Sequence, residues 1–510
     1  MKVKIIATGS PGTKIFISPI YFILKSYYNL RGNNKNKVEW GETIYDRNKS
    51  VQEIFDNIQH EKIDVLCLSI FIWNRAQLTH LAKMIKEKMP NVIIIAGGPD
   101  LDAHRNPTFF DNNNMFDYVV YGDGEEAFVT LLDSIIEKKE LINAYNIVTP
   151  NKIFPFRIFQ DDEFSKISPW LDLQKEVAET INFFGKDNSV IYWEMARGCP
   201  YSCSFCDWNN SLHNKVKRRR SNWKEEIDFF SELGAEVRVI DANWGMYKED
   251  IEIHKYALPK LQFTAMNLPK LNKKTAYELM SLSYQYFPEG RFVISLQDLN
   301  EDVLKNIDRP SPPWSEHKKL IKELQQKHPD LELRAELIIG LPGQTIDTWI
   351  DTLLELENIG INYLEANLWM MLPGSPAYKA DYQKKHQIKF DEIIFIKKDF
   401  KSYDEINFAV KNGLQGWYKT RMITSSISAD FSDILTMFAL ASVYNFLHAY
   451  YKKIKFVDLV DKLRNRLKEE CNEFAKIIDN TKTFSVQVDD KLVSLEEYYY
   501  EFAKIKTLLR

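Results

Sequence analysis

An alternation of short β-branched runs with helix-length segments constrains the fold of this chain more than any other feature of its sequence. In the first 150 residues, strand-like runs lie at 2–8, 63–71, 91–97 and 117–122, with helical candidates at 18–29, 51–60 and 77–89. Such alternation indicates a parallel sheet built from right-handed crossovers. We therefore expect the α/β class, with a doubly wound, Rossmann-like sheet at the N-terminus whose ligand loops follow the carboxyl ends of its strands.

A second series of strand-like runs begins after a stretch of weak periodicity that contains prolines. Its six members lie at 190–195, 236–241, 261–266, 291–297, 333–340 and 363–372. This spacing predicts a partial (β/α)6 barrel whose active site lies at the C-terminal ends of the strands. Helical, aromatic-rich segments predominate later in the chain. The predicted parts are a Rossmann-like domain over 1–150, a linker over 151–184, the barrel over 185–400 and a mostly helical region over 401–510.

The composition is that of a globular protein without a strong overall charge. Of the 510 residues, 45% are hydrophobic, and 67 Lys and Arg against 71 Asp and Glu leave a formal charge of −4. This balance gives no general attraction to nucleic acid or to an anionic membrane. The opening MKVKIIATGS does not resemble a signal peptide, and no run of about 18 apolar residues occurs. We expect a cytoplasmic protein that binds neither nucleic acid nor membrane.

Three of the five cysteines gather within eight residues, directly after the first strand of the second series. Cys199, Cys203 and Cys206 have the spacing C-x3-C-x2-C. Thiolates select zinc or iron–sulfur centres, and three of them on one loop can hold three corners of an iron cubane, which leaves the fourth iron open to a substrate. The alternative is a zinc site completed by a distant ligand such as His213, although the second C-x2-C knuckle typical of structural zinc is missing.

With Phe205 in the aromatic position before its last cysteine, this loop resembles the cluster motif of the radical S-adenosylmethionine (SAM) superfamily. The resemblance implies that Cys199, Cys203 and Cys206 hold a [4Fe-4S] cluster whose fourth iron binds the amino and carboxylate groups of SAM. Reductive cleavage of the sulfonium would then give a 5′-deoxyadenosyl radical that abstracts hydrogen. The protein would align the cluster, the sulfonium and the target C–H bond and would exclude quenchers.

Polar residues at the ends of later barrel strands fall where that superfamily binds SAM. Asp241 and Asn243 close one strand and are candidates for binding its ammonium group or ribose, although such residues also serve as caps and Asx turns. Ser295 and Gln297 share one face of the next polar-ended strand, which makes them candidates for contacts to the nucleoside.

Glu336 stands in an apolar strand, where a carboxylate needs hydrogen-bond donors. Adenosine or another bound group would supply them in the functional interpretation. A salt bridge to Arg291 or Arg334 is the structural alternative. The turn GLPGQT at 340–345 is typical of the superfamily, yet its glycines and proline are equally explained by the shape of the turn.

The N-terminal loops narrow the resemblance to the cobalamin-binding radical SAM enzymes, and it then covers residues 1–400. Polar or glycine-containing loops follow three of the strands, and glycine lets the backbone approach a large ring without a Cβ clash. The residues that this resemblance implies as cobalamin contacts are Ser69, Trp73, Asn74, Gly97, Gly98, Gly122, Gly124 and Glu125.

One signature of the cobalamin mutases is absent. The sequence D-x-H-x-x-G does not follow the first strand, where residues 7–12 read ATGSPG. Cobalt would therefore have no histidine from that motif below it, and Trp73, Asn74, Arg75 and water are the candidates for that face. A cobalt poorly ligated from below suits transfer of a methyl group from its upper face.

Two further features have plain structural interpretations. The run Lys215–Arg220 carries five positive charges in six residues and most simply forms a solvated loop, although one arginine could approach a carboxylate or phosphate at the barrel mouth. The aromatic C-terminal helices, with Trp417, Tyr418, Phe431 and Tyr444, are more simply core than a substrate wall.

These features together predict a cobalamin-dependent radical SAM C-methyltransferase. One SAM would remethylate the cobalamin, a second would supply the radical, and a carbon of a natural-product or peptide substrate would take the methyl group. A cobalamin-dependent rearrangement, ring contraction or cyclisation is the first alternative, and a corrinoid- or metal-binding sensor is the second. A flavodoxin or ferredoxin would supply the electron. The substrate, the oligomeric state and the role of the C-terminal region carry no readable signal.

Overall fold

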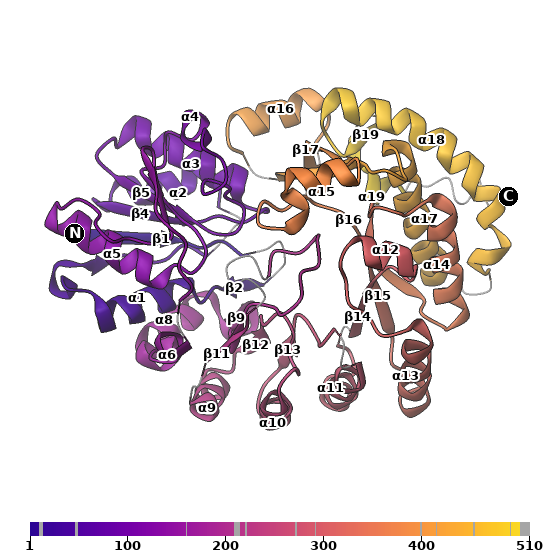
Figure 1. Cartoon of the computed structure of the whole chain (residues 1–510), viewed down its shortest axis with the longest axis horizontal. Helices are drawn as coiled ribbons and strands as arrows, with labels where there is room; N and C mark the ends of the chain where they lie inside the picture. The colour runs from indigo at the N-terminus through magenta and orange to yellow at the C-terminus, as the bar shows by residue number, and fades with distance from the viewer. Residues whose placement is uncertain are drawn as a thin grey trace. The chain divides into compact units, whose positions relative to one another are not determined.

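A computed structural model describes residues 1–499 except for 10–13, 46–48, 160, 209–214, 220–221, 271–272, 291, 398–399, 415, 452–453 and 490. The chain divides into two compact units (Figure 1). Unit 1 comprises Met1–Pro200, Asp207–Leu268 and Gly413–Gln415. Unit 2 comprises Tyr201–Cys206, Pro269–Asn412 and Gly416–Arg510.

A seven-stranded sheet forms the N-terminal part of unit 1, with the strand order β3-β1-β4-β5-β6-β7-β8. Its strands are β1 (Lys2–Ile6), β3 (Glu39–Trp40), β4 (Val65–Ser69), β5 (Ile93–Gly97), β6 (Tyr118–Val120), β7 (Ile147–Thr149) and β8 (Lys152–Ile153). The pairs from β3 to β6 are parallel, whereas β7 and β8 add an antiparallel hairpin at one edge. The parallel pairs place the carboxyl ends of β1, β4, β5 and β6 along one edge, where a ligand is expected.

Helices cover both faces of this sheet, which confirms the predicted doubly wound arrangement (Figure 1). On one face, α2 (Val51–Gln59) and α3 (Arg75–Lys88) share an apolar core cluster with β4 and β5. On the other face, α1 (Ile20–Arg31) packs beside α5 (Glu125–Glu137). The short elements are η1 (Lys35–Lys37) and α4 (Phe109–Asn112).

The second sheet of unit 1 contains the first three predicted barrel strands. Its order is β13-β12-β9-β2, and every pair is parallel. The strands are β2 (Ile15–Ile17), β9 (Ser189–Trp193), β12 (Glu236–Val239) and β13 (Phe263–Ala265). The strand β2 follows β1 in the sequence but belongs to the second sheet, where it pairs with β9. The first 20 residues therefore contribute one strand to each sheet. The strand β2 was not predicted from the sequence.

Helices and a short hairpin surround the second sheet. These elements are α6 (Asp161–Phe164), α7 (Pro169–Asp172), α8 (Gln174–Phe184), η2 (Lys186–Asn188), β10 (Ala196–Arg197), β11 (Lys217–Arg218), α9 (Trp223–Leu233) and α10 (Lys248–Ala257). The hairpin pairs Arg197 with Lys217, directly before the cysteine loop. Trp170 of α7 is buried against Phe22 and Phe230, which ties α7 to α1 and α9.

The other three predicted barrel strands form a parallel sheet in unit 2, with the order β14-β15-β16. The elements are α11 (Lys273–Tyr286), β14 (Phe292–Gln297), α12 (Glu301–Asn306), α13 (Trp314–Lys327), β15 (Leu333–Ile339), α14 (Ile346–Asn358) and β16 (Tyr363–Leu368). In the turn at 340–345, the Gln344 carboxamide oxygen accepts hydrogen bonds from the amides of Gly340 and Leu341 at 2.8 and 2.9 Å. All six predicted strands are therefore present, three in each unit.

The C-terminal region of unit 2 is mostly helical, as predicted. Its elements are η3 (Pro376–Tyr378), α15 (Ala380–Lys385), β17 (Lys389–Ile396), α16 (Tyr403–Lys411), β18 (Trp417–Ser425), α17 (Phe431–Tyr450), η4 (Phe456–Asp458), α18 (Val460–Thr481), β19 (Ser485–Val488), β20 (Lys491–Ser494) and α19 (Leu495–Glu497). The strands β19 and β20 pair antiparallel near the end of the described residues. In the described residues, no helix combines the length and the apolar character needed to cross a bilayer.

The assignment of Trp417 and Tyr418 to a helix is wrong. Both residues lie on β18, which pairs antiparallel with β17. The partner strand precedes β18 by more than twenty residues, with α16 between the two, and neither strand has a regular apolar alternation. The local pattern therefore did not reveal the pairing.

Candidate active site

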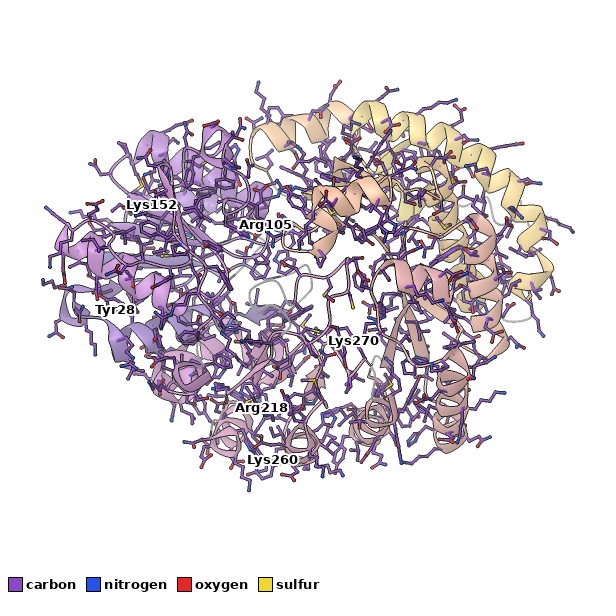
Figure 2. All side chains as sticks on the ribbon, in the orientation of Figure 1. Tyr28, Arg105, Lys152, Arg218, Lys260 and Lys270 are labelled. Carbon is purple, nitrogen blue, oxygen red and sulfur yellow. The ribbon has the colours of Figure 1, made fainter. Side chains whose placement is uncertain are left out.

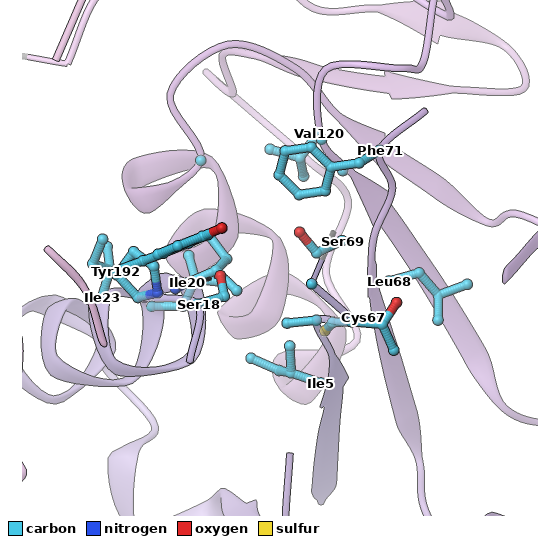
Figure 3. A pocket seen from close by; sticks show the side chains of 18 of the residues that line it. Ile5, Ser18, Ile20, Ile23, Cys67, Leu68, Ser69, Phe71, Val120 and Tyr192 are labelled. Atoms are coloured by element: carbon cyan, nitrogen blue, oxygen red, sulfur yellow. Dashed lines mark hydrogen bonds between the residues drawn. The ribbon is translucent and has the colours of Figure 1, made fainter. Parts of the chain in front are cut away.

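A large pocket in unit 1 lies at the carboxyl ends of β1, β4, β5 and β6 (Figure 3). Its cavity volume is about 370 Å³. Cofactor pockets have volumes of roughly 300–1,000 Å³. Six residues predicted as cobalamin contacts line this pocket: Ser69, Trp73, Gly97, Gly98, Gly122 and Gly124.

The opposite wall of this pocket comes from the second sheet of unit 1. Tyr192 of β9 lies across the pocket from Ser69 and Phe71 (Figure 3). Glu194 and Arg197, which follow β9 and precede the first cysteine, also line the pocket. One cavity is therefore enclosed by the N-terminal sheet and by the strand that leads into the cysteine loop.

The loop after β4 presents two stacked aromatic rings to the pocket. The rings of Phe71 and Trp73 have centroids 4.6 Å apart and an interplanar angle of 7°. The Trp73 indole donates a hydrogen bond to the carbonyl oxygen of Thr8 at 3.2 Å, which fixes its orientation. Three side chains, Trp73, Asn74 and Arg75, are candidates for the lower face of the cobalt. Of these three, Trp73 lines the pocket.

The other two candidates have partners within the protein. The Asn74 amide nitrogen donates to Thr8 and to the carbonyl oxygen of Ser69, and its oxygen accepts from the amide of Phe71 at 2.8 Å. Arg75 pairs with Asp100 at 2.7 Å. Asn74 therefore shapes the loop that carries Trp73, and neither Asn74 nor Arg75 is among the residues that line the pocket.

Gly98 has a requirement for glycine that comes from the protein itself. Its φ is +109°, and a Cβ at this position would lie 2.2 Å from the carbonyl oxygen of Ile70. We expect Gly98→Ala to cost at least about 1–3 kcal/mol of stability and to weaken cobalamin binding, because the loop after β5 must shift. Thermal unfolding and a hydroxocobalamin titration followed by absorbance measure both effects.

Gly124 provides the matched control for this substitution. It lines the same pocket, its φ is −92°, and the nearest atom to an added Cβ is Val120 Cγ1 at 3.7 Å. Gly124→Ala should leave the unfolding temperature close to that of the wild type. Equal stability of the two variants would contradict the argument from the Ile70 clash.

The first cysteine of the predicted cluster motif lies in a buried polar setting in unit 1. Cys199 is 2% exposed, and the Asn243 amide nitrogen donates to its sulfur at 3.1 Å. Asp241 accepts a hydrogen bond from the amide of Met195 at 2.8 Å. Burial raises the pKa of the Asp241 carboxyl to about 8, against the opposing effect of the Ala196 and Met195 amides. Asp241 thus braces the segment before the cysteine loop.

The hydrogen bond from Asn243 to Cys199 gives a prediction about the cluster potential. A donor to a cluster sulfur stabilises the more negative, reduced state. We expect Asn243→Leu to lower the reduction potential of the reconstituted cluster, as measured by a redox titration followed by electron paramagnetic resonance (EPR). Asn267→Leu is the control, because the Asn267 amide donates instead to the carbonyl oxygen of Asp241 at 3.4 Å. An unchanged or higher potential in Asn243→Leu would speak against the role of this bond.

The other two cysteines lie in unit 2, in a segment that is pinned by Ser204. Ser204 is fully buried; its amide donates to the carbonyl oxygen of Ile307 at 2.8 Å, and its hydroxyl is 2.8 Å from that of Tyr382. The amide of Cys206 donates to the carbonyl oxygen of Cys203 at 3.1 Å. This segment is therefore held in unit 2 by hydrogen bonds that involve neither thiol.

Three sequence-predicted residues meet near these cysteines in unit 2. Ser295 and Glu336 are neighbours in the β14–β15 register, and the Gln297 amide nitrogen is 3.3 Å from a Glu336 carboxylate oxygen. Gln297 has a φ of 64°, and the register shifts between Ser295 and Gln297. The strand irregularity lets both polar side chains remain at the end of β14. Arg334, the alternative partner of Glu336, pairs with Glu332 at 2.7 Å, and Arg291 lies outside the described residues.

Sequence reasoning missed Arg309, which joins this group. The guanidinium is 7% exposed and donates to the carbonyl oxygen of Ser295 at 2.5 Å. Burial lowers the pKa of Arg309, while the nearby Cys203 and Glu336 act in the opposite direction. A lone arginine before a proline has no signal in the sequence that separates it from a surface residue.

Buried acceptors without protein partners fit the predicted cofactors. In the described part of the chain, Asn243 Oδ1 and Gln297 Oε1 have no hydrogen-bond partner. Both are able to accept from the ammonium or hydroxyl groups of SAM. Among the described residues, no three His, Cys, Asp or Glu side chains converge closely enough to hold a single metal ion. In a cubane each thiolate binds a different iron, so its ligands need not converge on one point. His213, the alternative zinc ligand, lies outside the described residues.

The expectation of a solvated basic loop at Lys215–Arg220 is wrong for three of its members. Lys217 pairs with Asp123 at 2.7 Å, Arg218 with Asp250 at 2.7 Å, and Arg219 with Glu226 at 2.6 Å. Figure 2 labels Arg218, whose side chain is 16% exposed. Arg220 lies outside the described residues. The basic run therefore connects three acidic groups of unit 1.

Comparison with known proteins identifies both predicted cofactor domains. The B12 binding domain family matches residues 36–132, and the Radical SAM superfamily matches residues 193–356. The cobalamin-dependent radical SAM methyltransferase TokK of Streptomyces tokunonensis is 29% identical over 344 residues, which cover 64% of this chain and 49% of TokK. By these family matches, the chain combines a B12 binding domain with a radical SAM domain.

A second curated relative is also named as a methyltransferase. The 2-(S-pantetheinyl)-carbapenam-3-carboxylate methyltransferase of Streptantibioticus cattleyicolor is 28% identical over 338 residues, covering 61% of this chain and 48% of the relative. The chain thus spans about half the length of the curated relatives it matches.

Two solved structures share the fold of this chain. The methyltransferase TsrM of Kitasatospora setae, solved with cobalamin and a [4Fe-4S] cluster, has a TM-score of 0.56 at 10% identity, covering 93% of this chain and 99% of TsrM. The cobalamin-dependent radical SAM enzyme OxsB has a TM-score of 0.58 at 12% identity, covering 100% of this chain and 79% of OxsB. The two matched domains, B12 binding and radical SAM, have cobalamin and a [4Fe-4S] cluster with SAM as their cofactors.

Proposed function

We propose that this cobalamin-binding radical SAM enzyme transfers a methyl group from cobalamin to a carbon of a small natural product or a peptide. The observation that carries the proposal is the shared pocket of unit 1. Glycine loops of the B12 domain form one wall, and Tyr192, Glu194 and Arg197 form the other. Of these three residues, Arg197 lies two positions before Cys199. Cobalamin bound there would lie next to the start of the cluster loop. The curated relatives, which are methyltransferases by name, support this proposal.

The chain's own residues would divide the work as follows. Cys199, Cys203 and Cys206 would hold the cluster, while Gln297, Glu336 and Arg309 of unit 2 would bind polar groups of SAM. When bound, the cluster and SAM supply a radical that removes hydrogen from the substrate, and cobalamin supplies the methyl group. Trp73 and Phe71 would cover the corrin ring of cobalamin with apolar surface and would thereby exclude water from it.

The substrate of the second relative favours a small molecule over a peptide. That protein is named for a carbapenam carboxylate, and it matches 61% of this chain. We infer a small natural-product substrate and an electron donor such as flavodoxin or ferredoxin. Intact-mass comparison of candidate substrates before and after turnover tests the first inference, because methylation adds one methylene to the mass.

The methyltransferase proposal can be tested without a substrate. Protein reconstituted anaerobically with iron, sulfide and hydroxocobalamin is mixed with SAM and titanium(III) citrate. We expect S-adenosylhomocysteine and methylcobalamin from methyl transfer to the cobalamin, together with 5′-deoxyadenosine from the cluster. Absence of methylcobalamin in a protein that contains both cofactors would refute the proposal.

The same experiment separates the alternatives. A cobalamin-dependent rearrangement, ring contraction or cyclisation would release 5′-deoxyadenosine without forming methylcobalamin. A corrinoid sensor would bind hydroxocobalamin and form neither product. Zinc in place of iron in the purified protein would favour the metal-binding alternative.

A further inference from the structure

A buried ionic network in unit 1 joins the B12 domain to the segment that precedes Cys199. Arg197 Nη1 lies 2.7 Å from Glu125 and 3.0 Å from Asp123, which flank Gly124 in the loop after β6. Arg197 Nε and Nη2 bind both carboxylate oxygens of Glu194 at 2.9 and 2.8 Å. Lys217 completes the network at 2.7 Å from Asp123. One guanidinium therefore connects carboxylates from two different sheets.

The network is well shielded from water. The side chains of Asp123 and Glu125 are 2% exposed, and those of Lys217 and Arg197 are 3% and 19% exposed. The Arg197 guanidinium lies 4.8 Å from the ring centroid of Phe164. Charges in such a setting interact more strongly than they do at the surface. The contacts of Arg197 therefore hold the two loops together with little competition from solvent.

The charge balance of the network makes Arg197 irreplaceable. Three carboxylates face two cations, so the network carries a net negative charge even with Arg197 present. Removing Arg197 would leave the buried Asp123 and Glu125 and the partly exposed Glu194 beside one lysine, and their mutual repulsion would drive the loops apart. A lysine at this position has no planar fork and would not bind Glu194 and Glu125 from separate nitrogens.

The position of the network connects it to both cofactor sites. Arg197 is two residues before Cys199, and Asp123 and Glu125 alternate with Gly122 and Gly124, which line the pocket. On the other side of the cysteines, Trp208 lies two residues after Cys206 and lines the same pocket. Both flanks of the cysteine segment therefore form part of the pocket wall.

We propose that Arg197 is a positioning residue that fixes the start of the cysteine loop against the cobalamin pocket and thereby sets the distance between cluster and cobalt. This inference rests on the proposed cofactor sites and concerns the alignment of the two cofactors with each other. A misplacement of about 1 Å can cost roughly 10²-fold in rate. An ionic clamp between the two loops, with Glu194 and Arg197 in the pocket wall, meets that demand.

The test uses the magnetic interaction between the two cofactors in the loaded protein. Reduced cluster and cob(II)alamin are both paramagnetic, and the cluster shortens the relaxation time of the cobalt signal by an amount that falls steeply with distance. The EPR power saturation of cob(II)alamin is compared with the cluster reduced and oxidised. We expect most of this enhancement to be lost in Arg197→Met at saturating cobalamin.

Arg218→Met is the matched control. Arg218 lies on β11, pairs with Asp250 and Glu249, and is 16% exposed, close to the 19% of Arg197. Among the described residues, Arg218 makes no hydrogen bond or ion pair with the loop after β6, and we expect Arg218→Met to keep the wild-type relaxation enhancement. Loss of the enhancement in both variants, or its retention in Arg197→Met, would overturn the proposal.

A measurement without cofactors guards against trivial failure. In the apo protein, amide hydrogen exchange over 194–199 and 122–126 should become faster in Arg197→Met by on the order of tenfold, with little change elsewhere in unit 1. If Arg197→Met does not fold, Glu125→Ala removes the side chain that Arg197 Nη1 contacts at 2.7 Å and should lose part of the enhancement. Unchanged exchange and unchanged relaxation in Glu125→Ala would then refute the clamp.

The failure of this inference differs from the failure of the proposed function. A wild type that binds both cofactors but forms no methylcobalamin would refute the methyltransferase proposal, while its relaxation enhancement would still report on Arg197. A wild type that forms methylcobalamin, with no difference between Arg197→Met and Arg218→Met, would refute the clamp alone.

Discussion

Cys203→Ala is expected to abolish the brown absorbance of the reconstituted protein and to reduce 5′-deoxyadenosine formation to background. A cubane held by two thiolates of the three would lose one protein-bound corner, and the site that binds SAM would disappear with the cluster. Cobalamin binding should persist, because Cys203 is not among the residues that line the pocket of unit 1. Iron analysis, absorbance spectra and chromatography of the nucleoside products measure the three effects.

Cys471→Ala is the control for the loss of a buried thiol. Cys471 is fully buried in α18, where its sulfur lies 3.3 Å from the Tyr499 hydroxyl, and burial raises its pKa to about 11. A thiol that remains protonated does not bind iron, so this variant should keep the cluster and the nucleoside product. Retention of iron and of 5′-deoxyadenosine in Cys203→Ala would contradict the assignment of the cluster ligands.

The parallel sheets were predictable because their signal is local. Each buried strand is a short β-branched run bounded by turn residues, and the intervening helices have the length of a crossover. The small strand β2 was missed because three residues, Ile15–Ile17, carry no periodicity. The pairing of β17 with β18 was missed because the two strands are separated in the sequence by α16, and neither segment alone carries the pattern that sets their register.

The candidate site was predictable where one residue type has few structural uses. Three clustered cysteines and glycine-containing loops at strand ends belong to that class, as Cys199 and Gly98 illustrate. Arg309 and Arg197 do not belong to that class, because an arginine in a sequence is equally compatible with a solvated surface. The basic run was misread for the same reason: Lys217 finds Asp123 at a sequence separation of 94 residues, which no local pattern encodes.

The largest stability effect is expected at Glu226, which lies at the centre of a second buried ion pair in unit 1. Glu226 is fully buried and binds Arg219 through both oxygens at 2.6 and 2.8 Å. Its remaining acceptor capacity is used by the Trp193 indole at 2.6 Å and by the Ser168 hydroxyl at 2.5 Å. One carboxylate thus satisfies three donors from β9, from the segment before α7 and from the segment after β11.

Glu226→Ala is therefore expected to destabilise unit 1 by about 3–5 kcal/mol, because it leaves the Arg219 charge buried without its partner. Chemical unfolding followed by tryptophan fluorescence measures the effect, and Trp193 reports on the site directly. Glu225→Ala is the control. Glu225 is the exposed neighbour of Glu226 in α9, and its replacement should change the stability by less than about 0.5 kcal/mol.

The double substitution Glu226→Leu with Arg219→Met separates the cost of a broken pair from the value of the pair itself. Replacing both charges by apolar groups removes the uncompensated cation, so the double variant should be more stable than Glu226→Ala. If it is equally unstable, the loss comes from the donors of Trp193 and Ser168 rather than from Arg219. That outcome would place the energetic weight of this site on hydrogen bonding to the sheet, and the argument from the buried charge would be wrong.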